Sequence, residues 1–151
     1  MLGADGQPLA SQEAILPLNM LAPGQVLPAS VFFPGQMALA PVRAQVITAM
    51  RLAPGDSRYL QTVIQNLLVS VAWNGLSANV QGQIVLPESE KPAARLWLAA
   101  VAYAANDQAV GYRRWEWSGS LKPGGSQGFA LAVYSLGPAI QRVEVLVEAR
   151  P

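Results

Sequence analysis

The chain has 151 residues, of which 52% are hydrophobic and 13% are charged, whereas soluble domains carry roughly 25% charged residues. This composition excludes an intrinsically disordered chain, and the longest apolar runs reach only about half of the roughly 20 residues in a membrane-spanning helix. The net charge of +1 comes from scattered residues without a basic stripe. We therefore expect no nucleic-acid partner and no transmembrane segment.

The sequence contains neither histidine nor cysteine. This removes the commonest general base and the strongest nucleophile, so we expect a protein that is not an enzyme and has no catalytic residue. Glu88 and Glu90, like Asn106 and Asp107, do not have the spacing of a calcium-binding loop. Both pairs consist of polar residues of the kind that occur in ordinary solvent-exposed loops and turns. We therefore expect no metal and no cofactor.

The N-terminal third predicts three strands, at residues 10–18, 26–33 and 42–50. Residues 54–59, which begin with Pro54 and Gly55, read as a linker because proline and glycine mark turns.

Beyond residue 60, alternating apolar and polar residues predict about seven short strands with frequent turns. Asn74-Gly75 is the strongest hairpin signal, and Asn106-Asp107 marks a second turn between strands at 95–103 and 110–117. Glu144 and Glu148 alternate with apolar residues and should lie on the opposite face from them. The residues expected on the apolar faces are Leu67, Val69, Val71, Trp73, Val80, Gly82, Ile84, Phe129, Leu131, Val133, Val143, Val145 and Val147.

The chain also contains an internal match. Residues 121–124 repeat residues 21–24 at an offset of 100, and residues 142–145 match residues 43–46 at a slightly smaller offset. Self-similarity of this kind predicts repeated modules. We interpret residues 1–53 as the C-terminal half of a first repeat, 54–59 as the linker and 60–151 as a complete domain. The predicted fold is all-β, an immunoglobulin-like antiparallel β-sandwich in a tandem repeat whose first copy is truncated.

Two stretches of the complete domain carry a family resemblance. Residues 80–84 read Val-Gln-Gly-Gln-Ile, and residues 121–126 read Leu-Lys-Pro-Gly-Gly-Ser before Phe129. With these stretches the domain resembles the FxLYD family, a bacterial and archaeal immunoglobulin-like group, although only Tyr103 of the motif that names the family is kept. The resemblance implies an extracytoplasmic or cell-surface protein with no enzymatic activity.

The most distinctive stretch for binding is residues 112–117. On a strand, Arg113, Trp115 and Trp117 share one face, while Tyr112 and Arg114 lie on the other. Aromatic residues beside arginine can stack on sugars or dock a protein partner, but the same two indoles can fill the core. We expect a structural or interaction module, and the alternative is a carbohydrate-binding module that contacts polysaccharide through these residues.

The strand at residues 95–103 is apolar on both faces, which indicates that something covers its outer side. The three N-terminal strands would also lack an opposing sheet. We expect self-association through the truncated first repeat, giving a homodimer; the alternative is that the N-terminal segment packs against residues 95–103 of its own chain.

Overall fold

The computed structural model describes residue 7, residues 10–34 and residues 42–151. Six strands lie in this part of the chain, all after residue 60, where the sequence predicted about seven. They are β1 (Val63–Val71), β2 (Ser77–Val85), β3 (Ala93–Tyr103), β4 (Ala109–Leu121), β5 (Ser126–Tyr134) and β6 (Arg142–Arg150). Among the described residues there is no helix with the length and hydropathy to cross a bilayer.

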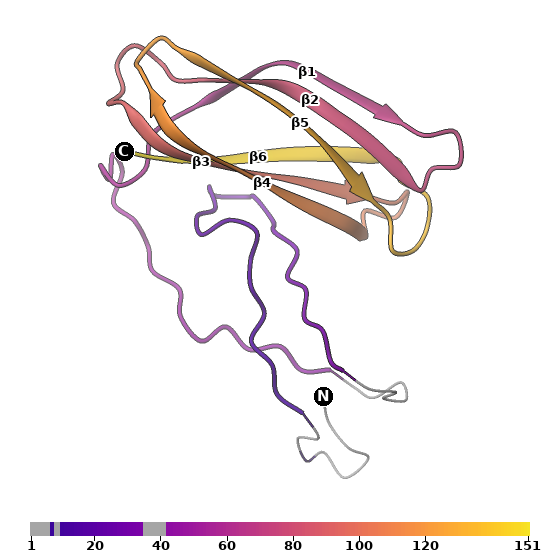
Figure 1. Ribbon diagram of the computed structural model, residues 1–151. Coiled ribbons are helices and arrows are strands. Elements are labelled where there is room, and N and C mark those ends of the chain that lie inside the picture. The colour runs from indigo at the N-terminus through magenta and orange to yellow at the C-terminus, as the bar shows by residue number, and fades with distance from the viewer. Residues whose placement is uncertain (1–6, 8–9, 35–41) are drawn as a thin grey trace.

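The strands form two antiparallel three-stranded sheets, with the orders β1-β2-β5 and β4-β3-β6, and the sheets face each other (Figure 1). The predicted all-β fold with two antiparallel sheets is therefore confirmed. Strands β4 and β5 approach each other along one side of the sandwich, where Leu136 N–H donates to the carbonyl of Val110 at 2.7 Å. On that side Gly111 has no room for a side chain, because a Cβ there would lie 1.9 Å from the carbonyl oxygen of Tyr134.

The inner faces of the two sheets form the main core. Phe129 and Val133 are buried in it, as the alternation predicted. Val143, Val145 and Val147 pack against the same core but stay partly exposed, because β6 is an edge strand with β3 as its one neighbouring strand. Each large apolar side chain that is fully buried contributes roughly 1.5–3 kcal/mol to folding.

A bulge in β1 changes the predicted alternation of that strand. The register between β1 and β2 shifts between Gln65 and Leu68, and Asn66 has a φ of 52°. The extra residue turns Val69 toward the core and leaves Leu67 and Leu68 exposed.

The predicted hairpin at Asn74-Gly75 is formed. Ala72 N–H donates to the carbonyl of Ser77 at 2.9 Å, and Gly75 has a φ of 69°, which a side chain would disfavour. Trp73, expected on a strand, lies in this turn instead and is 98% exposed.

The three predicted N-terminal strands are wrong. Residues 10–18, 26–33 and 42–50 contain no strand, and one isolated bridge between Ile15 and Ser30 is their only β pairing. A strand needs a neighbour for its backbone hydrogen bonds, and Pro17, Pro28 and Pro34 lack the N–H that such pairing uses. Residues 1–6, 8–9 and 35–41 of the predicted first repeat lie outside the described residues.

The internal match corresponds to a shared turn. Gly24 and Gly124 have φ values of 83° and 74°, and each follows a proline within a turn closed by a backbone hydrogen bond. The same turn occurs at Pro54-Gly55, where Gly55 has a φ of 74°. Proline followed by glycine is the usual pair at the centre of a type II turn. Strand β5 begins soon after Gly124, whereas the described residues 25–34 that follow Gly24 form no strand.

Candidate functional site

The outer face of sheet β4-β3-β6 is covered by the N-terminal segment of the same chain. Leu18 is 2% exposed and packs in a small second core with Trp97, Ala99 and Leu146, and Leu27 adds to its edge. Figure 1 shows the segment running below this sheet and away from the other one. The prediction that something covers the doubly apolar strand is confirmed, and the covering residues come from the chain itself.

Glu148 fastens this segment to the sheet. Its side chain is almost fully buried, and Oε2 accepts hydrogen bonds from the backbone N–H of Asn19 at 2.7 Å and of Met20 at 3.2 Å. The other oxygen, Oε1, pairs with Arg150, whose Nε lies 2.7 Å away. A buried carboxylate needs such partners, because an unpaired buried charge is strongly unfavourable. The sequence placed Glu148 opposite the core valines but contained no sign of its contact with Asn19.

The two tryptophans of the candidate site face the inside of the sandwich. Trp115 and Trp117 pack against the main core and are partly buried. The Trp115 ring lies 6.2 Å from the ring of Phe129, measured between centroids, at a tilt of 54°. Trp117 lies over Gly119, where a Cβ would come 2.5 Å from the indole. These positions agree with the interpretation in which the indoles fill the core.

Tyr112 and Arg114 lie on the opposite face, toward the N-terminal segment. The Tyr112 hydroxyl is 2.7 Å from Ser30 Oγ. The Arg114 guanidinium stands 5.6 Å from the centre of the Trp97 ring. Its buried Nε forms an ion pair with Glu116 at 2.8 Å and makes no hydrogen bond. The two faces of β4 therefore separate the candidate residues, as the alternation predicted.

Arg113 is exposed and forms no ion pair with any residue in the described ranges. It lines a groove where the start of β4 meets the end of β5 and the loop that follows. This groove also takes in Tyr112, Tyr134, Leu136 and part of the N-terminal segment. No acidic residue is part of its described lining, and of its two arginines Arg114 is paired with Glu116 while Arg113 is not, so the groove suits a ligand with a negative charge and an apolar part.

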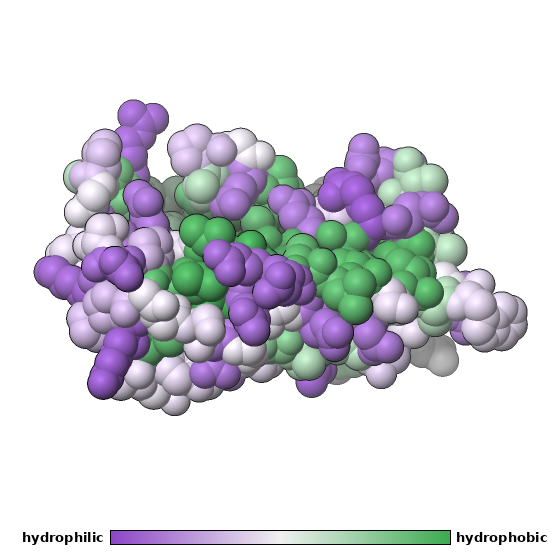
Figure 2. All heavy atoms as spheres, turned by 90° about the horizontal axis from the view of Figure 1, so that it is seen from above, coloured by the Kyte–Doolittle hydropathy of each residue, from purple (hydrophilic) through white to green (hydrophobic). Residues whose placement is uncertain are grey.

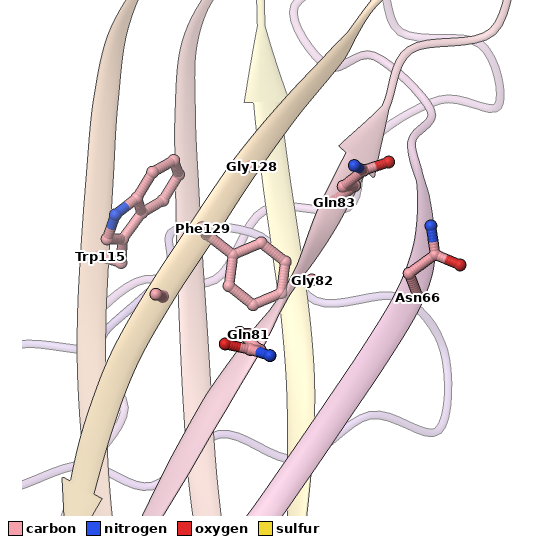
Figure 3. Close-up of a pocket in the computed structure, with 8 residues that line it drawn as sticks. Asn66, Gln81, Gly82, Gln83, Trp115, Gly128 and Phe129 are labelled. Atoms are coloured by element: carbon pink, nitrogen blue, oxygen red, sulfur yellow. The ribbon is translucent and has the colours of Figure 1, made fainter.

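A second, shallow hollow opens on the outer face of sheet β1-β2-β5. Figure 2 shows this side of the molecule, where apolar side chains form a band that polar side chains interrupt. Asn66, Gln81 and Gln83 line the hollow, and Trp115 lies at its side, beyond β5 (Figure 3). Strands β1, β2 and β5 carry no charged residue. The arrangement offers neutral hydrogen-bond donors and acceptors beside an aromatic ring.

The turn between β3 and β4 holds a set of charged groups. Asp107, with a φ of 59°, occupies the predicted turn and pairs with Arg142 at 3.0 Å. Arg142 also stacks on Tyr103, with 3.9 Å between the guanidinium carbon and the ring centre. Burial raises the pKa of the Tyr103 phenol above its ordinary value, and the nearby Glu144 carboxylate raises it further.

No group of three or more potential metal-ligating side chains occurs among the residues that the structure describes. Comparison with protein-family models found no match, and searches of curated proteins and of solved structures found no similar protein. The resemblance to the FxLYD family therefore stays a prediction from the sequence.

Proposed function

We propose that this chain is a non-enzymatic, immunoglobulin-like module of an extracytoplasmic prokaryotic protein, and that it acts as a structural spacer or interaction surface. The order of the strands supports the immunoglobulin-like part. Sheets β1-β2-β5 and β4-β3-β6 correspond to strands A-B-E and C′-C-F of such a sandwich. The resemblance to the FxLYD family supports the location and the lack of an enzymatic role.

The observation that carries the interaction role is the apolar surface of the N-terminal segment. Leu18 is buried against the sheet, but seven large apolar side chains of the same segment are 64–81% exposed. They are Ile15, Val26, Phe32, Val42, Val46, Ile47 and Met50. Large exposed apolar patches mark sites of protein association.

The most economical partner for this surface is a second copy of the chain. Residues 42–50 have no regular secondary structure and carry four of the exposed side chains, and no described residue hydrogen-bonds to their backbone. Two copies related by a two-fold axis would cover the same surface on each other. The proposed assembly is therefore a homodimer, with Leu18 and Leu27 remaining on their own sheet.

Light scattering of the full chain at micromolar concentration tests this proposal. The expected mass is about twice the 16.0 kDa of the chain. The double variant Val46→Ser and Ile47→Ser should shift the mass toward the monomer, whereas Leu136→Ser, an even more exposed apolar position on the folded domain, should not. A wild-type chain that stays monomeric would contradict the homodimer.

We propose carbohydrate binding as a second candidate function, because Trp115 and three amide side chains line the hollow in Figure 3. Amides bond sugar hydroxyls and aromatic rings pack on sugar faces. Electrophoresis through gels that contain neutral polysaccharides tests it. Retardation should be lost in the double variant Gln81→Ala and Gln83→Ala on β2 and kept in Gln108→Ala, an exposed glutamine in the turn between β3 and β4. The absence of retardation of the wild-type chain would exclude this candidate for the polysaccharides tried.

A further inference from the structure

Two loops at one end of the sandwich present the two most exposed large apolar side chains of the folded domain, Trp73 and Leu136. The β1–β2 hairpin carries Trp73, 98% exposed, and Leu76, 48% exposed. Leu136, in the loop between β5 and β6, is 94% exposed, and Tyr134, at the end of β5, is 63% exposed. We call these four residues the apolar tip. An indole this exposed gains nothing for folding, so the tip is best explained by a partner that covers it.

Backbone hydrogen bonds tie the two loops to each other. Ser135 N–H donates to the carbonyl of Leu76 at 3.0 Å, and Ile140 N–H donates to the carbonyl of Gly75 at 2.8 Å. Within the second loop, the Ser135 hydroxyl donates to the carbonyl of Pro138 at 2.6 Å. Gly75 packs so closely on Ala139 that an added Cβ would lie 2.6 Å from that side chain. The tip is therefore held in place before any partner binds, which lowers the cost of ordering it.

The tip lies at the end of the sandwich opposite to the point where the chain enters the domain. Leu60, just before β1, pairs with Ala149 near the end of β6, so entry and exit lie together. In Figure 1 the C-terminus lies at the left, whereas the β1–β2 hairpin projects at the right. A surface placed there can meet a partner without interference from the entry and exit strands.

The exposed side chain of Arg113 provides a positive charge in a groove beside the tip. Tyr134 and Leu136 also line the groove that contains Arg113, and this lining includes no acidic residue in the described chain. Arg113 forms no ion pair within the described ranges, so its charge is available to an anionic group. Guanidinium groups bind phosphate oxygens with paired N–H donors.

We propose that the apolar tip inserts into the surface of a phospholipid bilayer while Arg113 binds a lipid phosphate. Tryptophan and tyrosine favour the interface between headgroups and acyl chains, and leucine favours the acyl chains beyond it. The exposed side chains lie on loops at the end of the sandwich, and a stable protein interface needs about 800 Å² on each partner. Four side chains with one cation suit shallow and reversible insertion better than such an interface.

Tryptophan fluorescence with lipid vesicles tests this proposal in the full chain. The chain has four tryptophans; Trp97 is 8% exposed, and Trp115 and Trp117 pack against the core, so a blue shift on binding reports mainly Trp73. We expect a blue shift with equimolar phosphatidylcholine and phosphatidylglycerol, and quenching by brominated acyl chains. In vesicle sedimentation, Trp73→Ala and Leu136→Ala should each weaken binding about tenfold.

Two further variants separate the parts of the proposal. Arg113→Gln should remove the preference for vesicles with phosphatidylglycerol over pure phosphatidylcholine, and leave the weaker binding to phosphatidylcholine unchanged. Leu68→Ser, a 57% exposed position on β1 away from the tip, should bind vesicles like the wild type. Melting temperatures near the wild-type value would show that the tip variants fold. Failure of the wild type to bind vesicles, or equal binding by the tip variants, would overturn the proposal and leave a protein partner for the tip.

Discussion

The carboxylate of Glu148 and the backbone amide of Asn19 are 129 residues apart in the sequence and 2.7 Å apart in the fold. Hydrogen bonds to an ionised group are roughly twice as strong as neutral ones. Together with the second hydrogen bond, from Met20, this contact holds the N-terminal segment on the sheet, where its Leu18 packs against Trp97. One side chain of the edge strand β6 therefore helps to decide which surface the N-terminal segment covers.

Replacing Glu148 with alanine should release this segment. The amides of Asn19 and Met20 would lose their acceptor, and Arg150 would lose its ion-pair partner. We expect a loss of about 1–3 kcal/mol in the free energy of unfolding, because buried polar groups are left unsatisfied. Hydrogen exchange measured by mass spectrometry should show faster exchange in the peptide that contains residues 19 and 20.

Glu116→Ala provides the matched control for that variant. Its side chain is exposed, and its ion pair with Arg114 lies at the surface, so the change in stability should stay below about 1 kcal/mol. Unchanged exchange at residues 19 and 20 in the Glu148 variant would mean that the carboxylate does not hold the segment.

A second prediction concerns Trp115. Its indole packs against Phe129 and the main core while one side borders the hollow. Trp115→Ala should lower the melting temperature, with a loss below the roughly 3–5 kcal/mol of a fully buried aromatic side chain because Trp115 is only partly buried. Trp73→Ala, at the 98% exposed position, should melt close to the wild type. Equal melting temperatures for both variants would contradict the inward placement of Trp115.

The strands of the folded domain could be predicted because their signals are local. Alternation identified the inner faces that carry Phe129 and Val133, and the turn residues at Gly75 and Asp107 placed two hairpins. The number of strands was overestimated. The alternation of β1 was predicted incorrectly at Leu67, because the bulge at Asn66 shifts the register and no residue pattern in the sequence marks it. Trp73 was predicted incorrectly for another reason, since the strand ends before it and it lies in the turn.

The N-terminal segment shows the limit of the same reasoning. Residues 42–50 alternate much as the strands of the domain do, yet they form no strand among the described residues. Alternation reports which residues suit a sheet, whereas a sheet also needs a neighbouring strand, and that neighbour is not encoded locally. The contact between Glu148 and Asn19 is hidden for the same reason, since nothing near either residue indicates the other.

For the candidate site, the sequence separated the two faces of residues 112–117 but could not say which face is buried. Both indoles turned inward, and Arg113 alone of the candidates is exposed without an ion pair in the described chain. The residues beside it, Tyr134 and Leu136, come from a different strand and loop. Tyr134 and Leu136 lie near Arg113 because β5 packs beside β4. The alternation of apolar and polar residues within a strand does not indicate which strands become neighbours.

The third prediction tests that packing through Gly111. A Cβ at this position would lie 1.9 Å from the carbonyl oxygen and 3.0 Å from the carbonyl carbon of Tyr134, so backbone atoms would have to move apart. Gly111→Ala should therefore cost about 1–3 kcal/mol or more in a denaturant titration. Gly128→Ala is the control, since the nearest atom, the carbonyl oxygen of Gly82, is 4.0 Å from its added Cβ. A Gly111 variant as stable as the control would show that β4 and β5 are not in close contact.

The last prediction concerns alkaline pH. The fold raises the pKa of Tyr103 above its ordinary value of 10.0, first by burial and then by the Glu144 carboxylate, so the folded state favours the neutral phenol. This contribution to stability is fully present below pH 10.0 and is lost as the pH rises through the raised pKa of the folded state. Tyr103→Phe removes the ionisable group and keeps the ring beneath Arg142. The unfolding free energy of this variant, measured by urea titration across the alkaline range, should fall less steeply with pH than that of the wild type. A Tyr103 variant whose stability falls with pH as steeply as that of the wild type would contradict the coupling.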